Sequence, residues 1–230
     1  MTKICSCCGG ELEEIIEPSK VLDLFAGGSV RGIVATYLGF QYTGIEIRPE
    51  QIAANIEQAN KLNLKPVYIE GDSTKLLSLL PSGETYDMIF TCPPYFDLEV
   101  YSDTKQDMSV YTSYFSFLVW YKSIFKQAIS RLKQNRFAVV VVGEIRDKNG
   151  IYRNFVGDTI NSLCEAGAQY YNEAILVTAI GSLPIRTSKQ FPTGRKLGKT
   201  HQNVLVFFKG DPDKIKELQF MDTVIETNQE

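Results

Sequence analysis

The feature that most constrains the fold is an alternation of short apolar runs with helical periodicity, beginning near residue 20. Strands that alternate with helices form a mostly parallel sheet with helices on both faces. We therefore predict an α/β fold with a seven-stranded sheet. The runs that predict its strands span residues 20–25, 41–47, 66–70, 86–91, 137–143, 174–180 and 203–210.

Between most of these runs the apolar residues recur at the three- and four-residue spacing of a helix. The predicted helices span residues 30–38, 49–62, 74–80, 111–132 and 156–166. The last two strands have no helical pattern between them, so we expect them to form an antiparallel hairpin. The run 137–143 is the most hydrophobic, which is typical of a strand inside a sheet.

Composition predicts a globular protein, and we expect no membrane-spanning segment. Of its 230 residues, 44% are hydrophobic and 22% charged. No apolar run approaches the roughly 20 residues of a membrane span, and the first residues lack the apolar core of a signal peptide. We expect a cytoplasmic protein with no membrane partner. The net charge of −3 means that any nucleic-acid contact must come from a local basic patch.

The cysteines are unevenly distributed, with three of five in the first eight residues. Cys5 and Cys8 have the spacing of half a zinc ribbon, but the other half is missing, so we expect no metal site. We predict a cysteine-rich segment at 1–18, one catalytic domain at 19–210 and a polar tail at 211–230.

Three predicted strands end in residues suited to nucleotide binding. The first leads into a glycine turn at residues 26–28, which lets the backbone approach a ligand. The second ends at Glu46, 23 residues after Asp23, where an acid can accept hydrogen bonds from both ribose hydroxyls. The third ends at Asp72. A triphosphate-binding loop is absent from the sequence.

These strand ends carry four short motifs in a fixed order: DLFAGG at 23–28, GIE at 44–46, GD at 71–72 and CPPY at 92–95. In this order they resemble the S-adenosylmethionine-dependent methyltransferases. Within them the chain is similar to the DNA amino-methyltransferases, which act on adenine N6 or cytosine N4, and more narrowly to their small phage and mobile-element forms. The resemblance covers about residues 19–210. It implies a Rossmann-like class I methyltransferase fold with strand order 3-2-1-4-5-7-6.

The resemblance also implies a role for each motif around S-adenosylmethionine. The glycine turn would hold the methionine part, the second motif the ribose and the third the adenine edge. The implied cofactor-binding residues are Asp23, Phe25, Ala26, Gly27, Glu46, Ile47, Asp72, Ser73 and Cys92.

The CPPY motif would form the catalytic end of the site, with Cys92, Pro93, Pro94 and Tyr95. An exocyclic amine is a poor nucleophile because its lone pair is delocalised into the ring, and acceptors aimed at its N–H groups counter this. In the family the first proline carbonyl is one acceptor, which matches Pro93, and the two prolines hold it rigidly. The aromatic residue stacks on the flipped-out base, which matches Tyr95. The neighbouring Phe96 is a further predicted substrate contact.

Cys92 departs from the family, which carries Asp, Asn or Ser at this place. Sulfur is a weak acceptor as a thiol and a strong one as a thiolate. The T-S-P-P-Y form, typical of cytosine-N4 enzymes, differs by one atom, which favours cytosine weakly. Cytosine-C5 enzymes use a nucleophilic cysteine that follows a proline, whereas Cys92 precedes the prolines. Cys92 could also be only a small buried residue at a strand end.

The segment between the last two strands, residues 182–200, contains five cations and no acid. If the sixth strand is parallel to the first five, this segment lies at the same sheet edge as Cys92 and is suited to a DNA backbone. We predict that it forms a structureless loop. The predicted DNA contacts are Tyr95, Phe96, Arg186, Lys189, Arg195, Lys196, Lys199 and His201.

Two questions stay open at this point. The acidic segment 97–107 could be a lid or a reader of base edges, and target choice must come from residues 97–113 and 182–200, from a partner protein or from a homodimer. The alternatives to a DNA methyltransferase are an RNA or protein-glutamine methyltransferase and a cofactor-binding protein without catalytic activity.

Overall fold

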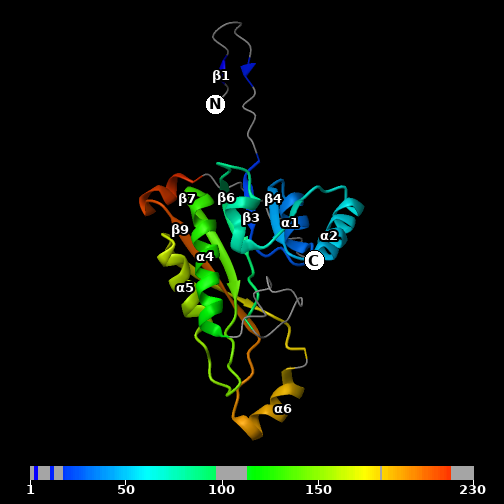
Figure 1. The fold of residues 1–230 in the computed structure, drawn as a ribbon, viewed down its shortest axis with the longest axis vertical. Helices are drawn as coiled ribbons and strands as arrows, with labels where there is room; N and C mark the ends of the chain where they lie inside the picture. Colours follow the sequence, from blue (N-terminus) through cyan, green and yellow to red (C-terminus); the bar gives the residue numbers. More distant parts are fainter. Residues whose placement is uncertain (1–2, 5–10, 13–17, 97–112, 182, 219–230) are drawn as a thin grey trace, which may run out of the picture.

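A seven-stranded sheet forms the centre of the structure (Figure 1). The computed structural model describes residues 3–4, 11–12, 18–96, 113–181 and 183–218. In spatial order the strands are β5 (Val67–Glu70), β4 (Gln41–Glu46), β3 (Lys20–Asp23), β6 (Tyr86–Thr91), β7 (Leu132–Val142), β9 (His201–Lys209) and β8 (Gln169–Val177). All neighbours pair in parallel except β9, which is antiparallel to both β7 and β8. The predicted order 3-2-1-4-5-7-6 and the terminal hairpin are confirmed.

Helices pack on both sides of this sheet. The α-helices are α1 (Val30–Tyr37), α2 (Pro49–Lys61), α3 (Leu76–Leu79), α4 (Tyr114–Arg131), α5 (Phe155–Glu165) and α6 (Leu183–Gly194). α1 and α2 contact β4 and β5, whereas α4 and α5 contact β7, β8 and β9. Side chains alternate between the two faces along a strand, so Leu22 of β3 points into the core beneath α4, and its neighbour Asp23 points to the opposite face.

The core beneath α4 and α5 is rich in aromatic rings. Phe117, Tyr121 and Phe125 lie one helical turn apart on α4, and all three are fully buried. The ring centroid of Tyr121 lies 5.4 Å from that of Phe155 on α5. These contacts fix the two helices over the half of the sheet that contains the hairpin.

Gly44 of β4 is packed so closely by Tyr42 and Ala26 that a side chain at this position should destabilise the fold. A Cβ atom at Gly44 would lie 2.8 Å from Tyr42 Cε1 and 2.9 Å from Ala26 Cβ, and neither residue can retreat because both are buried. Gly44→Ala should therefore lower the free energy of unfolding by about 1–3 kcal/mol. Urea denaturation measures this as a shifted midpoint at constant slope. A Cβ at Gly28 would meet no atom within 4 Å, so Gly28→Ala is the control. Equal midpoints for Gly44→Ala and wild type would contradict the prediction.

The structure corrects the prediction for residues 182–200. Residues 183–194 form α6 rather than a structureless loop. Pro184 is the second residue of this helix, where the missing amide donor is not needed. The following chain packs back closely, because a Cβ at Gly198 would overlap Leu183 and Thr187. Two predicted strands also begin earlier than expected, β7 at Leu132 and β8 at Gln169.

The described parts of the two terminal segments are short. β1 (Lys3–Ile4) and β2 (Glu11–Leu12) form a small antiparallel sheet of their own. After β9 the chain forms a 3-10 helix, η3 (Pro212–Glu217), and the backbone N–H of Asp211 donates to Asn135 Oδ1 at 3.0 Å. The predicted domain limits at 18/19 and 210/211 stay predictions. Among the described residues no helix is both long and apolar enough to cross a membrane.

Candidate functional site

A cavity of about 400 Å³ opens at the carboxyl edge of the sheet, where the ends of four parallel strands meet. Such an edge, between β3 and its neighbours, is where open α/β sheets bind their ligands. The cavity is lined by Leu24, Phe25, Gly27, Gly28, Arg31, Ile45, Glu46, Ile47, Arg48, Gly71, Asp72, Ser73, Cys92, Pro93, Pro94, Tyr95 and Gln202. The three predicted nucleotide-binding motifs and the CPPY motif therefore share one cavity.

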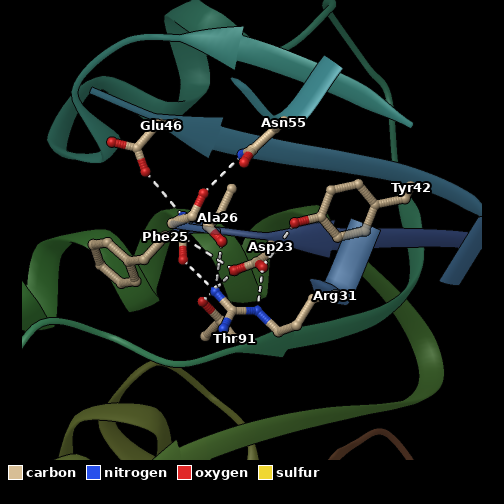
Figure 2. A network of polar contacts seen from close by, with 9 residues as sticks. Asp23, Phe25, Ala26, Arg31, Tyr42, Glu46, Asn55 and Thr91 are labelled. Atoms are coloured by element: carbon tan, nitrogen blue, oxygen red, sulfur yellow. Dashed lines mark hydrogen bonds and ion pairs between the residues drawn. The ribbon is translucent and has the colours of Figure 1, made fainter. Parts of the chain in front are cut away.

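The turn after β3 is held by side chains from two other elements (Figure 2). Gly27 has φ of +52°, a left-handed conformation that favours glycine. Its backbone N–H donates to Glu46 Oε2 at 2.9 Å, and its carbonyl accepts from Asn55 Nδ2 at 2.7 Å. Asn55 was not among the predicted residues. Its only sequence signal is a polar residue on the buried side of α2.

Asp23 does not line the cavity, although it was predicted to bind the cofactor. It is fully buried and points to the α1 face of the sheet. Its carboxylate accepts from Tyr42 Oη at 2.8 Å, Thr91 Oγ1 at 2.7 Å and Arg31 Nε at 2.6 Å, and from the Phe25 amide. Asp23 therefore holds the turn and the end of β6 from behind. Ala26 is also fully buried and outside the cavity lining.

Burial and the neighbouring Asp23 shift the pKa values of Arg31 and Tyr42. Burial alone would lower the pKa of Arg31, but the Asp23 carboxylate raises it above its ordinary value. Burial, and then the Asp23 charge, raise the pKa of Tyr42. Near neutral pH Arg31 is therefore a charged guanidinium, and Tyr42 is a neutral phenol that donates to Asp23.

Glu46 lies at the end of β4 as predicted, facing the cavity from a largely buried position. Its Oε2 accepts from the Gly27 amide and its Oε1 from the Arg48 amide at 3.0 Å. The Arg48 guanidinium lies 3.5 Å from the same Oε1. A carboxylate offers about four lone-pair positions, so it can accept further hydrogen bonds from a ligand while it orders the turn.

The end of β5 presents a third carboxylate to the cavity. Asp72 Oδ1 accepts from the Thr74 amide at 2.8 Å and so caps η1 (Ser73–Lys75). Ser73 is buried, and its hydroxyl donates to the carbonyl of Leu24, the residue after β3. Asp72 is therefore available at the cavity surface, whereas Ser73 mainly ties β3 to η1.

The segment after β6 crosses the other side of the cavity, where Cys92, Pro93, Pro94 and Tyr95 all line it. Tyr95 Oη accepts from Gln202 Nε2 on β9 at 2.7 Å. The Tyr95 ring also packs edge-on against Phe155, with 5.8 Å between centroids. Two elements distant in sequence therefore fix this ring.

Phe96 does not face the cavity, although it was predicted as a substrate contact. It is 4% exposed and its ring lies 5.4 Å from that of Phe117 in the core. The reason is that the chain turns at this residue, where φ is +20°. Phe96 therefore anchors the end of the CPPY segment to α4.

The predicted cations of residues 182–200 lie on α6 and the chain after it. β8 is parallel to β7 and β6, so this segment leaves the sheet at the carboxyl edge, where β6 ends just before Cys92. Figure 1 shows α6 beyond this edge of the sheet. Lys189 and Arg195 are exposed, Lys196 and Lys199 half-buried, and none of them lines the cavity. His201 is half-buried at the start of β9. The side chain of Arg186 and residues 97–107 lie outside what the structure describes.

The turn after β7 lies next to this cationic segment. A Cβ at Gly150 would lie 2.7 Å from Lys196 Cε, so the two segments touch. The described residues contain no cluster of three or more potential metal ligands, and Cys5, Cys7 and Cys8 lie outside them.

Comparison with known proteins identifies the fold. No protein-family model and no curated protein matches the sequence. Solved structures match at low sequence identity. TrmN from Thermus thermophilus matches with 13% identity and a TM-score of 0.56, and the match covers 84% of this chain and 44% of TrmN. Magnesium protoporphyrin IX methyltransferase (ChlM) from Synechocystis PCC 6803, with bound SAM, matches with 11% identity and a TM-score of 0.54. The match covers 84% of this chain and 71% of ChlM.

The cyclase SpnF matches equally well, at 14% identity and a TM-score of 0.57, over 85% of this chain and 76% of SpnF. The chain spans less than half of TrmN. The chain thus has the Rossmann-like fold of class I methyltransferases. Because a cyclase shares it, the reaction has to be argued from the site.

Proposed function

We propose that the protein transfers a methyl group from S-adenosylmethionine to an exocyclic amino group of a DNA base, cytosine N4 or adenine N6. The observation that carries this proposal is the shared cavity: the Gly27 turn and Glu46 lie on one side, and Cys92 to Tyr95 on the other.

The residues of the first side fit the cofactor. Glu46 would accept hydrogen bonds from the ribose hydroxyls, Asp72 would face the adenine edge, and the Gly27 turn would approach the methionine part. A volume of about 400 Å³ lies in the range of small-molecule sites. The cofactor supplies this site with an electrophilic methyl group.

The residues of the second side fit a planar base that carries an amine. Pro93 and Pro94 have fixed φ angles, so the carbonyl between them has a constant direction in which to accept an N–H of the amine. The sulfur of Cys92 would accept the second N–H. Both contacts favour a pyramidal nitrogen, whose lone pair is then free to attack. The Tyr95 ring, held by Gln202 and Phe155, offers a face for stacking.

The charge distribution favours DNA over a protein substrate. The chain carries a net charge of −3, yet residues 183–201 contain only cations among their ionisable groups, with His201. Contacts between such a segment and phosphates position a duplex or a displaced strand without reading its sequence.

The test is methyl transfer by the purified protein to DNA, followed by mass spectrometry of the nucleosides. We expect methylation at cytosine N4 or adenine N6. Methyl groups found only in RNA or protein substrates would refute the DNA assignment. Bound S-adenosylmethionine without transfer to any of the three would support a binding protein without catalytic activity.

Cys92 distinguishes amine methylation from ring chemistry. If Cys92 only accepts a hydrogen bond, Cys92→Ser keeps an acceptor of similar shape, and turnover should stay within about tenfold, roughly 1.4 kcal/mol in the barrier. A nucleophilic cysteine replaced by serine would instead all but abolish turnover, because a hydroxyl is far less nucleophilic than a thiolate. The measurement is the turnover of Cys92→Ser, with Cys164→Ser, an exposed position, as the control.

DNA that contains 5-fluorocytosine gives a second readout, because this base traps covalent adducts at the ring. We expect no trapped adduct on a denaturing gel. An inactive Cys92→Ser variant together with a covalent band that requires Cys92 would refute amine methylation.

A further inference from the structure

Arg31 is the one residue of α1 whose side chain reaches the cavity in the part of the chain that the structure describes. Its Nε donates to Asp23 Oδ2 at 2.6 Å, and its Nη2 donates to the carbonyls of Phe25 and Ala26. Its Nη1 makes no hydrogen bond to any described residue. Since the side chain is 26% exposed, the guanidinium is neither a pure core element nor a solvated surface group.

Three hydrogen bonds hold the guanidinium plane in place before any ligand arrives. A guanidinium has five N–H donors in a fixed fork, and it prefers planar oxyanions such as carboxylates. Nε donates to Asp23, and Nη2 donates to the two backbone carbonyls. The two N–H groups of Nη1 take no part in these three bonds. Arg31 lines the cavity and can offer the two N–H donors of Nη1 to an oxyanion there while it keeps the three bonds that fix its side chain.

The position of Arg31 relative to the turn indicates which ligand group it would meet. Figure 2 shows Glu46 on one side of the turn and Arg31 on the other. Glu46 holds the turn through the Gly27 amide, and Arg31 holds it through the carbonyls of Phe25 and Ala26. A ligand with its ribose at Glu46 that extends across the turn therefore brings its far end to Arg31.

We propose that Arg31 binds the carboxylate of the amino-acid part of the cofactor, so that the site recognises this part by charge. This inference rests on the proposed function, because it takes S-adenosylmethionine as the ligand of the cavity. It gives Asp23 a role as a positioning residue, which orients Arg31 and does not itself touch the ligand.

Calorimetric titration with two product analogues tests the proposal. S-Adenosylhomocysteine has the carboxylate, and its decarboxylated form lacks only that group. Wild type should bind the first roughly 10- to 100-fold more tightly, as expected for a hydrogen bond between charged groups. Arg31→Gln also removes the bonds that hold the turn, which weakens both analogues alike, so the readout is the ratio of the two affinities. We expect this ratio to fall to about twofold.

The controls separate the possible failures. A wild type that binds both analogues equally would overturn the Arg31 proposal even if Arg31→Gln fails to fold. Equal weakening of both analogues in Arg31→Gln would mean that Arg31 only supports the turn, which would also overturn it. A wild type that binds neither analogue would refute the proposed cofactor itself.

Discussion

Replacement of Glu46 by alanine should weaken S-adenosylmethionine binding by about 2–4 kcal/mol, roughly a 30- to 1000-fold rise in the dissociation constant. Two losses add up. The ligand would lose charge-assisted hydrogen bonds to its ribose hydroxyls, and the Gly27 and Arg48 amides would lose the carboxylate that orders the turn. Calorimetric titration of the cofactor measures the sum. Glu46→Gln, which retains one acceptor oxygen, should be intermediate.

Glu70 is the matched control for this experiment. It is the register partner of Glu46 on the neighbouring strand β5 and also ends its strand, but it is exposed and outside the cavity. Glu70→Ala should change the affinity less than twofold. If Glu46→Ala binds as tightly as wild type, or no more weakly than Glu70→Ala, Glu46 is not part of the cofactor site.

The position of Glu46 could be predicted because parallel strands place their carboxyl ends at one edge. Once the strands ending near Asp23, Glu46, Asp72 and Thr91 were recognised from their apolar runs, the four motifs had to meet. The hairpin could be predicted for a similar reason, since no helical period separates the runs that became β8 and β9. Local pattern and topology decide these features.

The side-chain directions within the site could not be predicted in the same way. Asp23 is the last residue of β3, and the alternation along that strand turns it to the α1 face, behind the cavity. Gln202 reaches Tyr95 from 107 residues away, so no local pattern links the two residues. Arg31 and Asn55 looked like ordinary helix residues, because only the folded chain brings them to the turn.

For residues 183–194 the local sequence pattern is misleading, because it predicts a loop where the structure has the helix α6. Pro184, Pro192 and Gly194 are strong helix breakers in general. Pro184 lies in the first turn of α6 and Gly194 is its last residue, and these positions tolerate proline and glycine respectively. Pro192 lies inside the helix, where it lacks the backbone N–H that a regular helix would use. The helix fixes the backbone spacing of its two cations, Arg186 and Lys189, which a loop would leave variable.

Neutralisation of Arg195, Lys196 and Lys199 to glutamine should reduce the slope of log affinity for DNA against log salt by roughly 2.7, about 0.9 for each lost phosphate contact. At 0.1 M salt this corresponds to on the order of a hundredfold weaker binding. The three cations follow α6 at the carboxyl edge of the sheet, and acids are absent from residues 183–201. Fluorescence anisotropy at several salt concentrations measures the slope.

The same variant should bind the cofactor normally, because none of the three side chains lines the cavity. The control variant carries glutamine at Lys61, Lys65 and Lys126, which are exposed on other parts of the chain. It changes the net charge by the same amount, so a difference in DNA affinity between the two variants reports the position of the cations and not the total charge. A long-range field would lower the affinity of both variants alike, whereas direct phosphate contact lowers only the first. An unchanged slope in the first variant would show that DNA does not contact the cations after α6, and the proposed substrate would lose its main support.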